Sequence, residues 1–199
     1  TTGENFPLSD IVRKFPNAQL WIDAVSAFGA SDYIPYLDNI SAISFCSNKC
    51  LQAPAGLGIV VYKKKLKTQN RKCFTLNVER YRDSLPFTIP PQLIYSLDAA
   101  LSEPTRGKSK FDARRDLLIE DLKKVGIKCV NNNPSNSIIG FQHPHKNYEE
   151  LYCFLKDRDI VIYSGIPGIK DSFRISTMSH LFDSEYQTII GAFNESCLC

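Results

Sequence analysis

The chain lacks three features that would place it in a membrane or outside the cell. Its apolar runs are short: a typical one covers residues 57–62, which suits a strand, whereas a membrane-spanning helix needs roughly 20 apolar residues. Residues 1–5 contain no basic region followed by an apolar segment, so no signal peptide is present there. The seven cysteines form no C-x-x-C pair, and most lie in apolar stretches, as reduced cysteines do. We expect a cytoplasmic protein without membrane contact.

Histidine is scarce, which leaves little material for a metal site. The chain has three histidines, and two of them form the pair His143-Pro144-His145 with no cysteine or acidic residue close by in the sequence. This spacing indicates a solvent-exposed turn more than a metal site. We therefore expect no bound metal.

Charge is nearly balanced, and this argues against a nucleic-acid partner. Lysine and arginine number 24, aspartate and glutamate 21, and the formal net charge is +3. Residues 63–72 hold six positive charges, but no aromatic residues are interleaved with them. A solvated loop is therefore favoured, and salt-sensitive binding to DNA or RNA would revive the alternative. With 43% hydrophobic and 23% charged residues, the composition is that of a globular protein.

Strand and helix signals alternate in the first half of the chain. Residues 20–25, 40–45 and 58–62 are short apolar runs that predict strands buried on both faces of a parallel-type sheet. Residues 7–15 and 33–39 suit a helix and a helical turn, and leucines at 93, 97 and 101 predict a helix over 92–102. The pattern predicts an α/β unit.

A Pro/Gly break at residues 103–107 indicates a domain boundary. Beyond it the sequence predicts three helices and three strands. The helices cover 109–125, 148–157 and 183–193, and the strands cover 137–142, 160–163 and 172–176. We expect residues 1–103 to form an α/β domain and residues 104–199 a smaller α+β domain.

Two side chains at the ends of predicted strands carry the chemistry. Asp23 ends the first apolar run, at the sheet edge where α/β proteins bind ligands, although a capping role is equally compatible. Lys49 follows the second run and has the apolar neighbours Cys50 and Leu51, so its amine is less hydrated than an ordinary surface lysine. A carboxylate for a pyridinium nitrogen beside a lysine for a Schiff base is the pair that pyridoxal phosphate requires.

At these residues the sequence resembles a known family. The blocks at residues 22–29 (IDAVSAFG) and 47–52 (SNKCLQ), followed by the Pro/Gly loop at 53–58, are similar to those of the class V pyridoxal phosphate-dependent aminotransferases. Residues 162–165 and 171–175 resemble that family's closing motifs, so the resemblance runs from residue 1 to about 193. It implies fold type I, with residues 1–103 as part of the large cofactor-binding domain and 104–199 as the small domain.

The resemblance also implies roles for five residues. Asp23 would pair with the pyridine nitrogen, and Lys49 would form the internal aldimine and move the substrate proton. Ser26 would support the cofactor site, Thr88 would reach the cofactor phosphate of the neighbouring subunit in a homodimer, and Arg174 would bind the acid group of the substrate. A strand-end salt bridge is the alternative for Arg174, whose planar guanidinium suits a carboxylate or a phosphonate.

Departures from the family pattern leave the reaction open in part. The resemblance implies 2-aminoethylphosphonate as the amino donor and pyruvate as the acceptor. Residues 86–92 (PFTIPPQ) differ from the family's usual segment around the threonine, so another small amine is the alternative donor. The family's glycine- and hydroxyl-rich phosphate turn has no equivalent in the chain. We therefore expect the second half of a larger enzyme, whose large-domain sheet has exposed edges and an unfilled face. An inactive binding or scaffold module is the remaining alternative.

Overall fold

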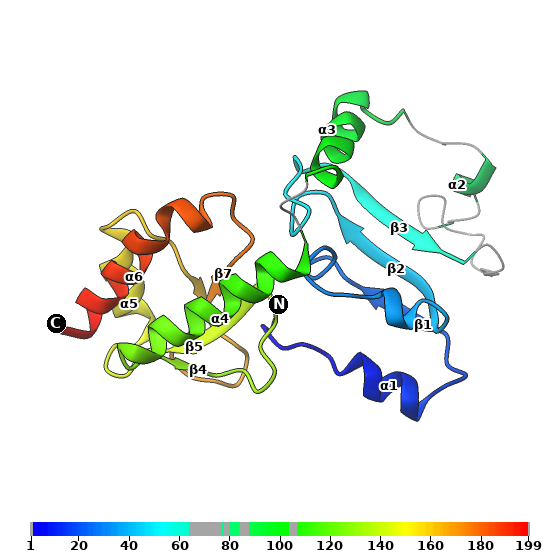
Figure 1. The fold of residues 1–199 in the computed structure, drawn as a ribbon. Helices are drawn as coiled ribbons and strands as arrows, with labels where there is room; N and C mark the ends of the chain where they lie inside the picture. The colour runs from blue at the N-terminus through cyan, green and yellow to red at the C-terminus, as the bar shows by residue number, and fades with distance from the viewer. Residues whose placement is uncertain (1, 64–76, 78–79, 84–87, 104–106, 199) are drawn as a thin grey trace.

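Two groups of elements, each built around its own sheet, make up the computed structural model (Figure 1). The structure describes residues 2–63, 77, 80–83, 88–103 and 107–198. The basic run at 63–72 lies outside these residues, apart from Lys63. The first group comprises α1 (Leu8–Lys14), β1 (Leu20–Asp23), the 3-10 turn η1 (Ile34–Tyr36), β2 (Ile40–Cys46), β3 (Gly58–Tyr62), α2 (Arg80–Asp83) and α3 (Pro91–Leu101). The second comprises α4 (Lys108–Lys124), β4 (Lys128–Cys129), β5 (Ile138–Gln142), α5 (Tyr148–Lys156), β6 (Tyr163–Ser164), β7 (Ser172–Ser176) and α6 (Phe182–Leu198).

The first sheet has the strand order β1-β2-β3. β1 runs parallel to β2, with Asp23 opposite Ser44, as expected for an α/β unit. β3 runs antiparallel to β2, which corrects the prediction of a parallel-type sheet for this strand. The three predicted strands otherwise lie within two residues of their observed bounds. Since β1 and β2 are parallel, their carboxyl ends meet at one edge of the sheet.

Burial on both faces holds for β2 but is wrong for its neighbours. β2 is buried along most of its length, whereas Trp21 on β1 is 62% exposed and Val60 and Val61 on β3 are 50% and 54% exposed. A continuous apolar run predicts that every residue of the strand is buried. β1 and β3 are exposed in part because they are the edge strands of this sheet. The exposed apolar side chains agree with the expectation of a sheet that is not fully covered.

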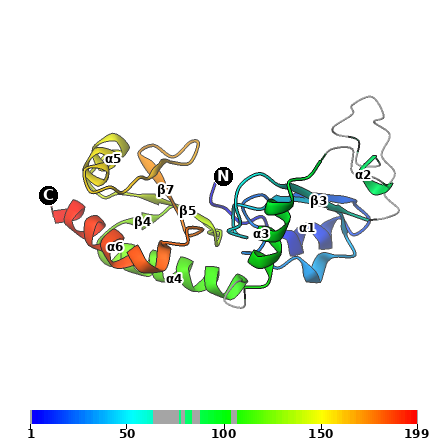
Figure 2. The ribbon, with the colours of Figure 1, turned by 90° about the horizontal axis from the view of Figure 1, so that it is seen from above.

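The second sheet is antiparallel, with the order β4-β5-β7-β6. Helices α4 and α6 lie side by side along it, and α5 packs beside α6 (Figure 2). Fully buried Phe141, Phe173 and Phe193 join strands and helix in one apolar core, with the rings of Phe173 and Phe193 stacked at 5.5 Å. The sequence missed the two-residue β4, and it placed β6 at 160–163 where the strand is Tyr163–Ser164.

The expected solvent-exposed turn is present at Pro144 and His145, but His143 itself is buried, which corrects the expectation for this residue. Its side chain is 5% exposed, and its Nδ1 accepts hydrogen bonds from the backbone N–H groups of His145 and Lys146 at 3.1 and 2.9 Å. Nε2 faces the hydroxyl of Ser196 at 3.2 Å and the Sγ of Cys197 at 3.3 Å. The ring therefore joins the turn before α5 to the last turn of α6.

The N-terminal segment runs along the second group before it reaches the first. Asn5 N–H donates to the carbonyl of Asn133 at 2.8 Å, and Ser135 N–H donates to that of Gly3 at 2.8 Å. These bonds fasten residues 3–5 to the loop before β5, ahead of α1. No helix in the described part of the chain is long and apolar enough to cross a membrane.

Candidate functional site

Asp23 ends β1 at the sheet edge where it was expected. One carboxylate oxygen, Oδ1, accepts a hydrogen bond from the backbone N–H of Val25 at 3.0 Å, so the side chain closes a local turn. Ala24 N–H donates to the carbonyl of Ser44 at 2.8 Å, which extends the pairing with β2 by one residue. The alternative of a helix N-cap is wrong, because residues 24–33 form turns and no helix, and the carboxylate of the exposed Asp23 closes one of these turns. A local bond to one oxygen leaves the carboxylate able to accept further hydrogen bonds.

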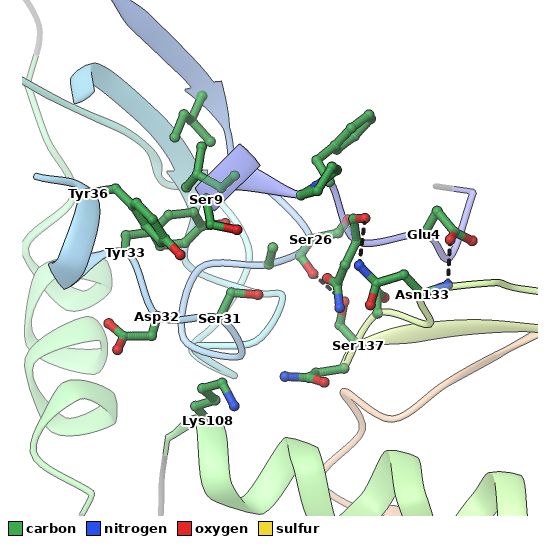
Figure 3. A pocket seen from close by; sticks show the side chains of 18 of the residues that line it. Glu4, Ser9, Ser26, Ser31, Asp32, Tyr33, Tyr36, Lys108, Asn133 and Ser137 are labelled. Carbon is green, nitrogen blue, oxygen red and sulfur yellow. Dashed lines mark hydrogen bonds between the residues drawn. The ribbon is translucent and has the colours of Figure 1, made fainter. Parts of the chain in front are cut away.

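The loop after β1 carries Ser26 to a junction between the two groups of elements. Its backbone carbonyl oxygen accepts the hydroxyl hydrogen of Ser137, the residue before β5 (Figure 3). The same oxygen accepts a hydrogen bond from the thiol of Cys50 at 3.4 Å. Burial raises the pKa of Cys50 to about 12, so the thiol stays protonated and can donate. Nearby, Asn136 Nδ2 donates to the carbonyl of Ala30 at 2.7 Å. The Ser26 loop is thus held by both sheets.

Lys49 lies in a turn directly after β2. The base of this turn is fixed by Ser47, which is fully buried and whose Oγ donates to the carbonyl of Pro54 at 2.6 Å. Its far side is closed by the backbone bond from Gln52 N–H to the Lys49 carbonyl at 2.9 Å. Lys49 itself is half-buried, between the exposed Asn48 and the buried Cys50. The less watery surroundings expected for this lysine are therefore present.

The pairing of β1 with β2 brings the Asp23 and Lys49 segments together. Both residues stand at carboxyl ends of neighbouring parallel strands, and Cys50, the residue after Lys49, bonds to the carbonyl of Ser26. Tyr33 lies near both segments. Burial raises the pKa of its hydroxyl, and the nearby Cys50 and Asp23 raise this pKa further. Asp23, Ser26 and Lys49 therefore surround one edge of the first sheet.

A cavity of about 780 Å³ opens beside this edge (Figure 3). Asp23 and Ser26 line it, together with Tyr33 and Ser137. Lys49, Thr88 and Arg174 are not among the described residues that line it. Cavities of this size accommodate small-molecule cofactors. The cavity therefore has room for a ligand next to Asp23, and the turn that carries Lys49 follows the neighbouring strand, β2.

Arg174 is placed at the centre of the second sheet. On β7 it lies opposite Gly140 of β5, and Ile138, two residues before Gly140, lines the cavity. Because residues two apart on a strand share a face, Arg174 and Ile138 lie on the same side of the sheet. The Arg174 Nε donates to the carbonyl of Ser164 at 2.7 Å, which orients the half-buried guanidinium. The predicted substrate residue thus lies on the cavity side of the second sheet.

Thr88 is exposed and lies three residues before the start of α3. The preceding residues 84–87 are outside the described ones. The role expected of Thr88 requires a second subunit, so the structure of one chain does not test it.

The residues present fit pyridoxal phosphate in two respects. The structure brings a carboxylate and a lysine to one sheet edge, which is the donor set that the pyridine nitrogen and the aldehyde of this cofactor need, and a cavity adjoins the carboxylate. In the described part of the chain, no cluster of three or more His, Cys, Asp or Glu side chains could hold a metal ion.

Sequence reasoning missed two residues of the junction, Ser137 and Gln52. Ser137 bonds across to Ser26, and the side-chain amide of Gln52 donates to the carbonyl of Met178 at 2.6 Å. Both contacts join residues more than a hundred positions apart. Gln52 belongs to the block at residues 47–52 that resembles the family, and this membership is the sequence feature that could have singled it out.

No family model matches the chain. Among curated proteins, a 2-aminoethylphosphonate–pyruvate transaminase of Phocaeicola vulgatus is 26% identical over 214 aligned positions, which cover 96% of this chain and 59% of that protein. The chain thus spans about three fifths of the length of this relative. Among solved structures, an aspartate aminotransferase of Thermus thermophilus matches 98% of this chain and 61% of its own, with a TM-score of 0.83 and 21% identity. A pyridoxamine–pyruvate aminotransferase of Mesorhizobium loti matches 99% of this chain and 58% of its own, with a TM-score of 0.78 and 18% identity.

These comparisons confirm the resemblance and the fold class predicted from the sequence. The match to the solved aminotransferases covers both sheets, because it extends over almost the whole chain. The chain is similar over nearly all its length to 2-aminoethylphosphonate–pyruvate transaminases and has part of the fold type I architecture of the class V aminotransferases.

Proposed function

We propose that this chain carries the lysine, aspartate and arginine of a pyridoxal phosphate-dependent aminotransferase that moves the amino group of 2-aminoethylphosphonate to pyruvate. The products would be phosphonoacetaldehyde and alanine. The observation that carries the proposal is the parallel pairing of β1 with β2, which puts Asp23 and Lys49 at one sheet edge. The names of the sequence relatives support the donor and the acceptor.

When bound, pyridoxal phosphate supplies an electron sink that stabilises negative charge on the substrate carbon. Asp23 would hold the proton on the pyridine nitrogen, and the bond from Val25 N–H keeps its carboxylate in place at the end of β1. The amine of Lys49 would attach the cofactor, and would then take a proton from the substrate carbon and deliver it to the cofactor, as transfer of the amino group requires. The buried Ser47, bonded to the carbonyl of Pro54, fixes the base of the turn that carries Lys49.

Arg174 would bind the phosphonate or carboxylate group of the substrate. A guanidinium presents two parallel N–H groups to an oxyanion, and the bond to the Ser164 carbonyl orients this one on the cavity side of the sheet. Ser26 would support the site through its loop. Thr88 would bind the cofactor phosphate of a second subunit, so the proposal includes a homodimer. We also propose that the protein is cytoplasmic. Residues 1–103 would belong to the large domain and 104–199 to the small domain.

The amino donor is tested by mixing the protein with pyridoxal phosphate and one amine at a time: 2-aminoethylphosphonate, alanine or serine. Transfer of the amino group to the cofactor changes its visible absorbance, and added pyruvate should reverse the change. We expect the largest change with 2-aminoethylphosphonate and a weaker response in Arg174→Lys. A larger change with alanine or serine would indicate another donor within the family. No change with any amine would contradict the transaminase and favour a binding module.

A further inference from the structure

Gln52 has a backbone conformation that its side chain does not favour. Its φ is +55°, in the left-handed region, and the other non-glycine residues with positive φ in the described part of the chain are Asp159 and Asp171. Aspartate and asparagine tolerate this region because their short side chains bond to the local backbone, whereas glutamine has no such advantage. Strained residues persist where surrounding contacts hold them, and they are common at functional sites.

Two hydrogen bonds hold Gln52 against the second group of elements. Its Nε2 donates to the carbonyl of Met178 at 2.6 Å, and its own backbone carbonyl accepts from Nε2 of His180 at 2.9 Å. The contacts are reciprocal, since each segment both donates and accepts. We call this pair of bonds the Gln52 clasp. It joins residues 126 and 128 positions apart in the sequence.

The clasp connects the Lys49 turn to the segment that follows Arg174. Gln52 N–H closes the turn by bonding to the Lys49 carbonyl at 2.9 Å. Met178 comes two residues after the end of β7, the strand of Arg174, and Thr177 between them is fully buried. A crevice of about 360 Å³ adjoins the clasp and is lined by both segments. Gln52 therefore links the two segments by hydrogen bonds, beside the apolar packing of Met178 against Cys50.

We propose that Gln52 is a positioning residue that holds the Lys49 turn in one arrangement relative to the lobe of Arg174. This inference rests on the proposed function, because it assigns the arrangement a purpose only if Lys49 and Arg174 act on one substrate. The left-handed backbone at Gln52 turns the side chain out of the lysine turn and across to Met178. Glycine would adopt this φ without strain but could not make the bond, so the strain is retained for the contact.

Two substitutions separate the contact from the backbone strain. Gln52→Glu keeps the size of the side chain but removes the N–H donor, because an ionised carboxylate only accepts hydrogen bonds. Gln52→Gly relieves the strain and removes the side chain altogether. Asp159→Gly is the matched control, because it relieves a left-handed residue that lies outside the clasp. His180→Ala removes the second bond and leaves Gln52 in place.

The measurement is the selectivity of pyridoxal phosphate for Lys49. The protein is incubated with the cofactor, the adducts are fixed with borohydride, and peptide mass spectrometry compares Lys49 with Lys170, whose side chain is 93% exposed. We expect Gln52→Glu, Gln52→Gly and His180→Ala each to lower the Lys49-to-Lys170 ratio about threefold to tenfold, the effect of losing one hydrogen bond. Asp159→Gly should leave the ratio unchanged. Amide hydrogen exchange should rise at 47–53 and at 177–181 in the three clasp variants.

The outcomes distinguish this inference from the function on which it rests. If the wild-type protein shows no preference for Lys49, the proposed function is wrong and the inference falls with it. If the wild-type preference is present and unchanged in the three clasp variants, the positioning role alone is overturned, even if their thermal stability falls. A fall in the ratio in the clasp variants, with the control unchanged, supports it.

Discussion

Ser137 donates its hydroxyl hydrogen to the backbone carbonyl oxygen of Ser26, three residues after the aspartate that ends β1. This bond ties the loop beside the candidate cofactor site to the first residue before β5, and thus to the sheet that carries Arg174. Residues assigned to one site therefore belong to two groups of elements, which this bond and an apolar cluster of Ala30, Cys50, Phe111 and Met178 join.

Removing the Ser137 hydroxyl should destabilise the protein measurably. Ser137 is 3% exposed, so water cannot easily replace its hydroxyl. In Ser137→Ala the Ser26 carbonyl keeps only the weaker thiol donor of Cys50 among the side chains that bond to it in the described part of the chain. We expect a loss of about 1–2 kcal/mol in the free energy of unfolding, measured by urea denaturation. Ser9→Ala, at an exposed position on α1, is the control and should change stability by less than about 0.5 kcal/mol. Equal effects of the two substitutions would contradict a role for the junction.

Arg114 on α4 should be one of the most sensitive positions in the second group of elements. Its side chain is 4% exposed, and its Nε and Nη2 bond to the two carboxylate oxygens of Asp183, each at 2.7 Å. Nη1 also donates to the carbonyls of Thr177 and Ser179. Arg114→Met should cost about 2–4 kcal/mol, because those carbonyls lose their donor while the half-exposed Asp183 stays hydrated.

Arg114→Lys distinguishes geometry from charge. Lysine keeps the positive charge but cannot make the paired bonds to Asp183, so we expect it to recover less than half of the lost stability. Lys124→Met removes ion pairs at an exposed position and should have an effect below about 1 kcal/mol. Full recovery in Arg114→Lys would mean that charge alone accounts for the contact.

Stability should rise with pH between about 4 and 6.5 because of His143. Burial, followed by the charges of Lys146 and His145, lowers the pKa of this ring to about 4 from an ordinary value of 6.5. In that range the unfolded chain binds a proton that the folded protein does not, so lowering the pH favours unfolding. The stabilisation is complete above pH 6.5, and a shift of this size corresponds to about 2–4 kcal/mol.

Substitution of His143 by a residue that does not titrate tests this assignment. Denaturation curves at pH 7 and pH 5 should differ less in His143→Gln than in the wild type, whereas His145→Gln, at an exposed position, should keep the wild-type difference. The same pH dependence in His143→Gln and in the wild type would assign the titration to other groups.

Local patterns predicted the elements well and their burial less well. The runs ending at Asp23 and preceding Lys49 appear as parallel strands, since periodicity and turn residues are properties of short segments. Val60 and Val61 look identical to buried strand residues in the sequence, but their exposure depends on what lies beside the sheet. The burial of His143 depends on its contact with Ser196 of α6, 53 residues later in the sequence. The Gln52 clasp joins residues that are 126 positions apart. Such contacts leave no local pattern.

The central claim is that Asp23 and Lys49 together hold pyridoxal phosphate, and covalent attachment tests it most directly. The protein is incubated with pyridoxal phosphate and reduced with borohydride, and the attachment site is identified by mass spectrometry in the wild type, Lys49→Ala, Lys170→Ala and Asp23→Asn. We predict attachment at Lys49 in the wild type and in Lys170→Ala, weaker attachment in Asp23→Asn, and none at this site in Lys49→Ala. Equal total attachment in the wild type and in Lys49→Ala, spread over exposed lysines, would contradict the claim.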